Sequence, residues 1–174
     1  LEDQMEPLTE SGTGSVSEQP VQPDFLPDKF EAGSHNAVGL AGLAAALRWI
    51  GKKSMASLTQ HDQELSRRFL QRVHGVSGIT LYGPTDPALR VAVFSVRVQG
   101  FEPAELSAVL ETEFGLLTRS GIHCAPLAHQ TIGTHDDGGT TRISFGAFNT
   151  LEEADRAADS LLQLVASNSG AQRA

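Results

Sequence analysis

An abrupt change of composition near residue 36 most constrains how this chain folds. Residues 1–35 hold four prolines and the Gly-Thr-Gly-Ser run at 12–15, but few aliphatic residues. This composition favours extended or looping backbone, and a loop of that length is unusual inside a compact domain. We therefore expect residues 1–35 to belong to a neighbouring domain or another subunit, and the packed domain to begin after them.

Two helices are expected directly after this change. Asn36 suits the N-cap of a helix that Gly51 would stop. The apolar run 37–50 predicts that this helix is buried, and it is too short to cross a bilayer. A second helix over residues 57–74 has charged positions between apolar ones at helical spacing, which predicts a structural amphipathic helix. Its apolar positions are Leu58, Leu65, Phe69, Leu70 and Val73.

Short strands and a third helix follow. Residues 79–82 and the alternating run 91–98 predict a hairpin-like pair of strands across a turn-rich segment. Pro103 suits the first turn of a helix, and Gly115 suits its end. A short strand is expected at residues 116–119.

The C-terminal third predicts one more strand and one more helix. Residues 140–145 form the strand, and Asn149 or Thr150 caps a helix that runs to about residue 166. The tail 167–174 is expected to be mobile. This order predicts an α+β fold in which helices pack on a small, mostly antiparallel sheet.

Charge and cysteine content exclude several classes. The chain has 174 residues, with 13 Lys and Arg against 21 Asp and Glu, a net charge of −8, and no long basic run. Nucleic-acid binding is therefore not expected, because it depends on clustered cations. A single cysteine fits a reducing cytosol, and hence a cytoplasmic protein. The N-terminus at Leu1 has no Met and no apolar signal core, so we expect a cut end rather than a targeting peptide.

The segment with the clearest chemistry is 119–126, Arg-Ser-Gly-Ile-His-Cys-Ala-Pro. It places Cys124, the only thiol of the sequence, beside His123 and five positions after Arg119. Neighbouring positive charge favours a thiolate nucleophile, although a lone cysteine is more often a small buried hydrophobe. Together with His129 and His135, the thiol matches no standard zinc spacing, so we expect no metal.

Five segments in order resemble the C-terminal part of the cysteine desulfurases, which belong to the class V aminotransferase fold among the fold-type I pyridoxal-phosphate (PLP) enzymes. They cover about residues 5–165. The segments are 12–15 (GTGS), 26–34 (LPDKFEAGS), 81–84 (LYGP), 119–126 (RSGIHCAP) and 141–150 (TRISFGAFNT).

The resemblance implies a homodimeric enzyme that takes sulfur from L-cysteine and releases alanine. A large domain holds PLP on a lysine, and a small C-terminal domain supplies a cysteine that becomes a persulfide. Cys124 occupies that position. A sulfur-acceptor protein is a further partner that the family allows.

The resemblance also assigns roles to residues around Cys124. Arg119 matches an arginine that holds the substrate carboxylate, a task suited to a planar guanidinium with two parallel donors. Arg142 matches a second arginine on the strand behind the loop, with an ion pair inside the sheet as the equally weighted alternative. His123 lies next to the thiol, among the substrate-binding residues.

Cofactor contacts are implied for Gly12, Thr13 and Ser34, which match positions near the PLP phosphate that are offered across the dimer interface. Glycine amides and hydroxyl groups are suitable phosphate donors. The chain departs from the family pattern at three positions. Ser11 replaces a glycine, Ser34 replaces a threonine but keeps the hydroxyl, and His35 replaces a proline.

None of the three lysines, Lys29, Lys52 and Lys53, lies in the context of the PLP lysine. The expected organisation is therefore a remnant of the large domain at 1–36, the small domain at 37–166 and the tail at 167–174. Two alternatives stay open: a class V aminotransferase or lyase without desulfurase activity, and a stand-alone module that carries sulfur or binds a partner. A histidine-lysine motif upstream would favour the enzyme, and a start codon just before Leu1 would favour the module.

Overall fold

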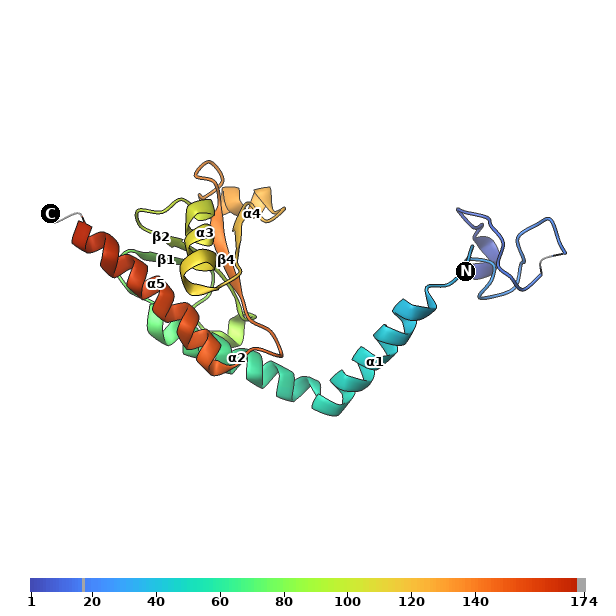
Figure 1. Cartoon of the computed structure of the whole chain (residues 1–174). Coiled ribbons are helices and arrows are strands. Elements are labelled where there is room, and N and C mark those ends of the chain that lie inside the picture. The colour runs from blue at the N-terminus through green and yellow to red at the C-terminus, as the bar shows by residue number, and fades with distance from the viewer. Residues whose placement is uncertain (17, 172–174) are drawn as a thin grey trace. The chain divides into compact units, whose positions relative to one another are not determined.

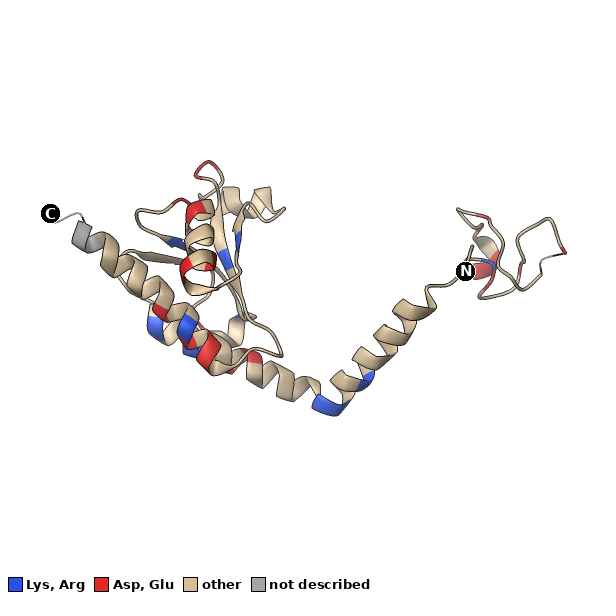
Figure 2. Ribbon diagram, viewed as in Figure 1, with Lys and Arg blue, Asp and Glu red and all other residues tan. Residues whose placement is uncertain are grey.

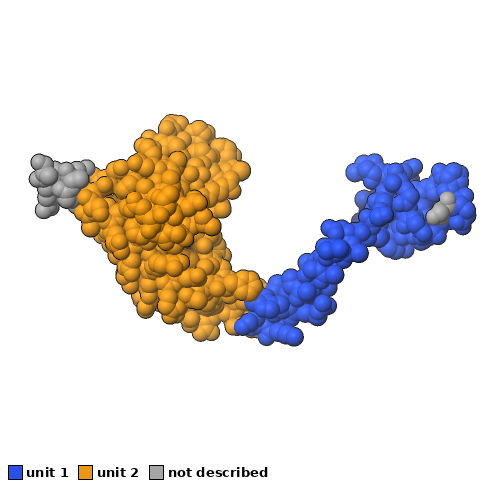
Figure 3. Space-filling view, in the orientation of Figure 1, with its two compact units in different colours: residues 1–53 blue, residues 54–174 orange. Residues whose placement is uncertain are grey.

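A computed structural model describes residues 1–16 and 18–171. The chain divides into two compact units, 1–53 and 54–174, which Figure 3 colours separately. The first unit contains a short 3₁₀ helix at Glu2–Gln4, a series of turns and helix α1 at Ala37–Lys53. The second contains the sheet and the other helices.

Helix α1 begins where the sequence predicts and ends later. The side-chain oxygen of Asn36 accepts a hydrogen bond from the amide of Gly39 at 2.9 Å, which confirms the N-cap. Gly51 does not stop the helix, because a glycine inside a helix costs only about 1 kcal/mol. The break comes at Ser54, whose φ of 67° is left-handed and whose hydroxyl caps the next helix.

The prediction that α1 is buried is wrong. No residue of this helix is buried in the structure, and several of its aliphatic side chains are more than half exposed. Burial needs a partner surface, and the apolar composition of a helix does not supply one. The exposed side chains are Val38, Leu40, Leu43 and Leu47.

The second unit is built on a four-stranded antiparallel sheet in the order β1-β2-β4-β3. The strands are β1 (Ile79–Tyr82), β2 (Val93–Val98), β3 (Arg119–Gly121) and β4 (Thr140–Ser144). The predicted hairpin is confirmed, since β1 pairs with β2 from Ile79 opposite Val98 to Tyr82 opposite Ser95. Strand β4 lies between β2 and β3, so β3 forms an edge of the sheet.

Helices α2 (Met55–Val73) and α5 (Leu151–Ala171) pack together and cover one face of the sheet, as Figure 1 shows. Helix α3 (Pro103–Phe114) packs against β3 and β4 and adds Leu106 and Leu110 to the same core. This arrangement confirms the predicted α+β fold. At the centre of the core, the ring centroids of Phe69 and Phe94 are 4.5 Å apart, and the ring centroid of Phe145 lies 5.6 Å from that of Phe69.

Strand β2 begins at Val93 instead of residue 91, and α2 begins at Met55 instead of residue 57. Three further local differences separate prediction and structure. The strand expected at 116–119 begins only at Arg119, because Gly115 adopts φ 65° to end α3 and the chain needs the next residues to reach β4. Helix α4 (Pro126–Thr131) was not predicted. Helix α5 continues to Ala171 instead of ending near residue 166.

The end of α5 is held by a side chain that the prediction overlooked. Asn168 donates to the carbonyl of Gln99 at 3.0 Å, which ties the last turns of the helix to the end of β2. The expected mobile tail is therefore helical up to Ala171, and its last positions, 172–174, lie outside the described residues. At the other end, Thr150 and Glu153 exchange amide and side-chain hydrogen bonds as a capping box, which confirms the predicted cap.

Side chains along β2 and β4 point alternately to the two faces of the sheet, and the face opposite the core is polar. Phe94, Val96 and Ile143 point to the core, so Ser95 and Arg142 point to the other side. Figure 2 shows basic positions on the strands and acidic positions on the helix and loop beside them. Among the described residues, no helix is both long and apolar enough to cross a membrane.

Candidate functional site

Two arginines face each other across strands β3 and β4. Arg119 is the register partner of Arg142, and Ser95 of β2 lies on the other side of Arg142. Directly paired residues of an antiparallel sheet point to the same face, with Cβ atoms about 5 Å apart. The structure therefore brings together the two arginines that the sequence analysis assigned to substrate binding.

Neither arginine is neutralised by a carboxylate within the described part of the chain, where the ion pairs involve other residues. The ion pair inside the sheet, the alternative role of Arg142, is thus not present there. The buried Nε of Arg142 also has no hydrogen-bond partner. Like charges in directly opposed positions repel, so this pair is a ready site for an anion.

Cys124 lies in a tight turn that follows β3. The amide of Ala125 donates to the carbonyl of Ile122 at 3.0 Å and closes the turn. Its two central residues, His123 and Cys124, have φ values of 56° and 59°. Positive φ at both centres is the pattern of a type I′ turn, which glycine or asparagine normally fills. Two ordinary side chains here store local strain.

The turn places the thiol against a guanidinium. Nη2 of Arg119 lies 3.5 Å from Sγ of Cys124, and the cysteine is exposed and free. Because Cys124 is exposed, it is not a small buried hydrophobic residue in this structure. The contact places a positive charge beside the sulfur, a setting typical of nucleophilic cysteines.

His123 contributes in a different way from that expected. Its Nε2 lies 2.9 Å from the carbonyl of Arg119, and since a carbonyl only accepts, Nε2 carries the hydrogen. Partial burial, opposed by this hydrogen bond and reinforced by Arg142, lowers the pKa of His123 below its usual 6.5. The ring is therefore neutral at neutral pH, and the positive charge beside the sulfur comes from Arg119.

His129 lies behind the turn, on α4. It is buried, and its Nδ1 is 2.7 Å from Oγ1 of Thr134, which is also buried. The sequence analysis weighed this histidine only as a zinc ligand. In the described part of the chain, no group of three potential metal ligands comes together.

The three residues assigned to the PLP phosphate belong to the first unit. The amide of Gly33 donates to the carbonyl of Gly12 at 3.0 Å, which joins the segments that carry Thr13 and Ser34. The hydroxyl of Thr13 lies 2.9 Å from that of Ser15. The hydroxyls of half-buried Thr13 and exposed Ser34, together with glycine amides, fit a phosphate by their donor chemistry.

PLP also forms a covalent bond to a lysine, and the three lysines of this chain do not suit that bond. Lys29 is buried, and its Nζ donates to the carbonyl of Glu2 at 3.1 Å and lies over the ring of Phe30. Lys52 and Lys53 are exposed at the end of α1. The first unit therefore supplies donors of the kind that a phosphate needs, but no lysine placed for the attachment of PLP.

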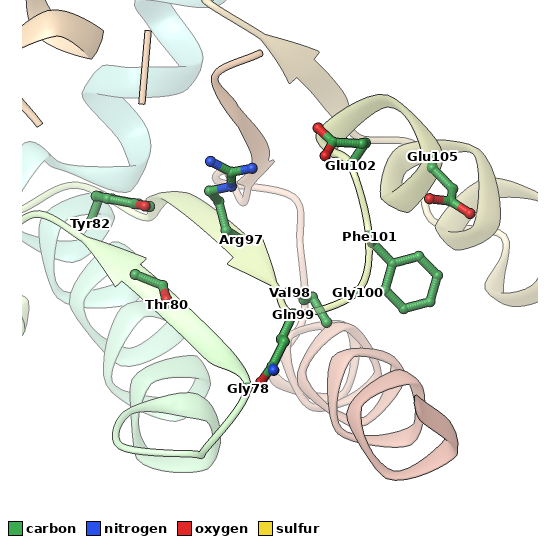
Figure 4. Close-up of a pocket in the computed structure, with 10 residues that line it drawn as sticks. All are labelled: Gly78, Thr80, Tyr82, Arg97, Val98, Gln99, Gly100, Phe101, Glu102 and Glu105. Carbon is green, nitrogen blue, oxygen red and sulfur yellow. The ribbon is translucent and has the colours of Figure 1, made fainter. Parts of the chain in front are cut away.

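A groove on the polar face of the sheet was not predicted. It has a volume of about 700 Å³. Figure 4 shows Tyr82 and Arg97 projecting into it from neighbouring strands, with Glu102 and Glu105 on the α3 side. Arg97 also forms an ion pair with Asp137 at 3.1 Å. The strand alternation of β2 is the signal that would have placed Arg97 on this face.

Sequence comparisons identify the family of the chain. A family model described as "Aminotransferase class-V" matches residues 1–157. A probable cysteine desulfurase of Methanothermobacter thermautotrophicus is 29% identical over 166 residues, 94% of this chain and 41% of that protein. One from Vibrio cholerae is 33% identical over 131 residues, 75% of this chain and 31% of that protein. The chain thus spans about two fifths or less of these relatives.

Solved structures of cysteine desulfurases are similar to this chain in fold and sequence. The apo structure of a cysteine desulfurase from Thermococcus onnurineus NA1 has a TM-score of 0.74 and 30% identity, and covers 81% of this chain and 34% of that one. The cysteine desulfurase CsdA from Escherichia coli has a TM-score of 0.67 and 26% identity, and covers 79% and 33%.

Proposed function

Because the chain belongs to the class V aminotransferase family, we propose that it is the persulfide-bearing part of a PLP-dependent cysteine desulfurase. The observation that carries the proposal is the contact between Cys124 and Arg119 at 3.5 Å, on a turn beside a pair of arginines without carboxylate partners. A nucleophile next to an anion site is what a cysteine substrate needs. Its thiol is attacked while its carboxylate is held.

The two arginines bind and orient the substrate. Two guanidinium groups on one face of β3 and β4 offer parallel donors to the two oxygens of a carboxylate. Binding an anion there also relieves the repulsion between the two positive charges. The substrate carboxylate is then fixed relative to Cys124 through Arg119, which contacts the sulfur as well.

Cys124 carries out the sulfur transfer. Its thiolate attacks the sulfur of L-cysteine, so that a sulfur–sulfur bond forms as the carbon–sulfur bond of the substrate breaks. The electron pair of the broken bond stays with the substrate carbon, which takes up a proton and leaves as alanine. PLP, when bound, would supply the electron sink next to that carbon. Thr13, Ser34 and the amide of Gly12 would hold the PLP phosphate of the other copy in a homodimer.

The proposed enzyme also contains a lysine-bearing half and is a homodimer. The persulfide sulfur of Cys124 is then transferred to an acceptor protein. The similarity to cysteine desulfurases over about a third of their length supports this arrangement. The thiol favours desulfurase over plain aminotransferase, since transamination needs no thiol.

The test uses the complete protein that carries this chain together with its lysine-bearing half. A yellow, borohydride-sensitive absorption band shows that the cofactor is present, and alanine release from L-cysteine then measures turnover. We expect Cys124→Ala to keep the band and abolish turnover. Unchanged alanine release would remove the thiol from the mechanism and favour a lyase, and a coloured protein that releases no alanine from L-cysteine would favour an aminotransferase.

A further inference from the structure

Buried His129 contacts the residues on both sides of Cys124. Its ring lies against that of His123, with centroids 5.6 Å apart and an angle of 45° between the planes. Its backbone amide donates to the carbonyl of Ala125 at 3.1 Å. One histidine therefore contacts the residue before Cys124 with its ring and the residue after Cys124 with its backbone amide.

Thr134 in turn fixes His129. The hydroxyl of Thr134 is 2.7 Å from Nδ1 of His129, and the amide of Thr134 donates to the carbonyl of His129 at 2.9 Å. The carbonyl of Thr134 accepts from the amide of Gly139 at 2.8 Å, which extends the network to the segment before β4. Both side chains are almost fully buried, with 4% of His129 and 1% of Thr134 exposed.

The turn needs this support because its conformation is strained. His123 and Cys124 both have left-handed backbone angles, and such residues persist only where the surroundings over-determine them. Cys124 itself is exposed, so its own side chain packs against little that would hold it. The support has to come from its neighbours.

We propose that His129 and Thr134 act as a positioning pair that holds the 122–125 turn so that Cys124 faces Arg119. The pair acts through His123 and Ala125. The inference rests on the proposed role of Cys124, and it gives His129 and Thr134 a role that the sequence did not indicate.

The experiment measures how fast iodoacetamide alkylates Cys124 at neutral pH. Because Cys124 is the only cysteine of this sequence, the mass of the intact chain reports this site alone. We expect Thr134→Val, which keeps the shape but loses the hydroxyl, to slow alkylation roughly fivefold or more because the thiol leaves its guanidinium partner. Thr134→Ser keeps the hydroxyl and should restore the rate.

A matched control separates positioning from general stability. Thr141 is buried and donates its hydroxyl to the carbonyl of Pro103 at 2.8 Å, and as the register partner of Val96 it lies on the core face of the sheet, opposite to the face that carries Arg142. Thr141→Val should therefore cost stability and leave the alkylation rate unchanged. A second readout is the NMR titration of His123, whose pKa should rise toward its usual value in Thr134→Val when the ring loses its buried contact.

A folded Thr134→Val chain with an unchanged alkylation rate and an unchanged His123 titration would overturn the proposal. If this variant fails to fold, His129→Asn decides by the same readouts, because asparagine keeps a partner for Thr134 but removes the ring against His123. Neither readout needs L-cysteine or PLP. The alkylation rate and the His123 titration therefore test the pair even if the complete protein proves inactive. If the protein is active and neither readout changes, only the positioning role of His129 and Thr134 is rejected.

Discussion

Arg119 and Arg142 occupy directly opposed positions on β3 and β4, on the face of the sheet that the core does not cover. Arg68, by contrast, reaches Asp155 of α5 with two hydrogen bonds of 2.8 and 2.7 Å. The chain therefore pairs a helix arginine with a carboxylate and leaves two strand arginines facing each other. Such an arrangement weakens the unliganded fold slightly and favours an anion between the strands.

Removing the charge of Arg142 should stabilise the free chain. Arg142→Met keeps most of the aliphatic stem and ends the repulsion with Arg119, so we expect the free energy of unfolding to rise by about 0.5 kcal/mol. Urea unfolding measures this change. Arg68→Met is the control and should lower stability, since it breaks the bond to Asp155. Equal destabilisation by both variants would contradict the anion-site interpretation.

Arg119→Lys should weaken the use of L-cysteine by the complete protein. An ammonium group keeps the charge and loses the planar pair of donors, which costs about 2 kcal/mol if the charged contact is desolvated in the enzyme. Steady-state kinetics would show this as a fall of about thirtyfold in kcat/KM. Unchanged KM and kcat would remove Arg119 from substrate binding.

The titration of His123 should lower stability in acid. Because burial lowers the pKa of His123 in the folded chain, the unfolded chain takes up a proton more readily as the pH falls below about 6.5. The free energy of unfolding therefore decreases below that pH and levels off below the folded pKa. His123→Gln, which keeps a donor for the Arg119 carbonyl, should lack this component. NMR titration of the His123 ring would contradict the account if its pKa lay above 6.5.

Gly139 is expected to be intolerant of a side chain. Its φ is 85°, and a Cβ there would overlap the carbonyl group of Gly121 at the end of β3. Gly139→Ala should therefore lower the free energy of unfolding by about 2 kcal/mol or more. Gly138→Ala is the control: its φ is 76°, but its Cβ would meet only Glu102 at 4.0 Å. The control should cost about 1 kcal/mol, and equal thermal shifts for both variants would refute the close approach.

This close approach gives the Gly138-Gly139 segment a structural role. Gly139 is buried, and its amide donates to the carbonyl of Thr134 at 2.8 Å. Glycine is needed at this point because the backbone passes another strand closely. Sequence alone does not distinguish that use of glycine from flexibility.

The fold was largely predictable because its signals are local. Strand β1 and helix α3 start and end where the alternation, Pro103 and Gly115 indicate. The exposure of α1 and the extension of α5 were not predictable in the same way. Both depend on surfaces remote in sequence, namely a surface that would cover the apolar side chains of α1 and the Gln99 carbonyl that Asn168 reaches.

The candidate site was predicted as a set of residues and not as a geometry. Resemblance placed Arg119, His123, Cys124 and Arg142 in one region, and the structure brings them onto the end of β3 and β4. The direct pairing of the arginines depends on strand register. The burial of His129 against Thr134 depends on helix α4, which the short sequence signal did not reveal.

The central claim is that Cys124 receives the sulfur of L-cysteine. The most direct measurement is the mass of the peptide that contains Cys124 after the complete protein has been incubated with L-cysteine and quenched without reductant. The account predicts one additional sulfur atom on Cys124, in step with alanine release and absent from Cys124→Ser. Alanine release with an unmodified Cys124, or with the extra sulfur on another residue, would contradict it.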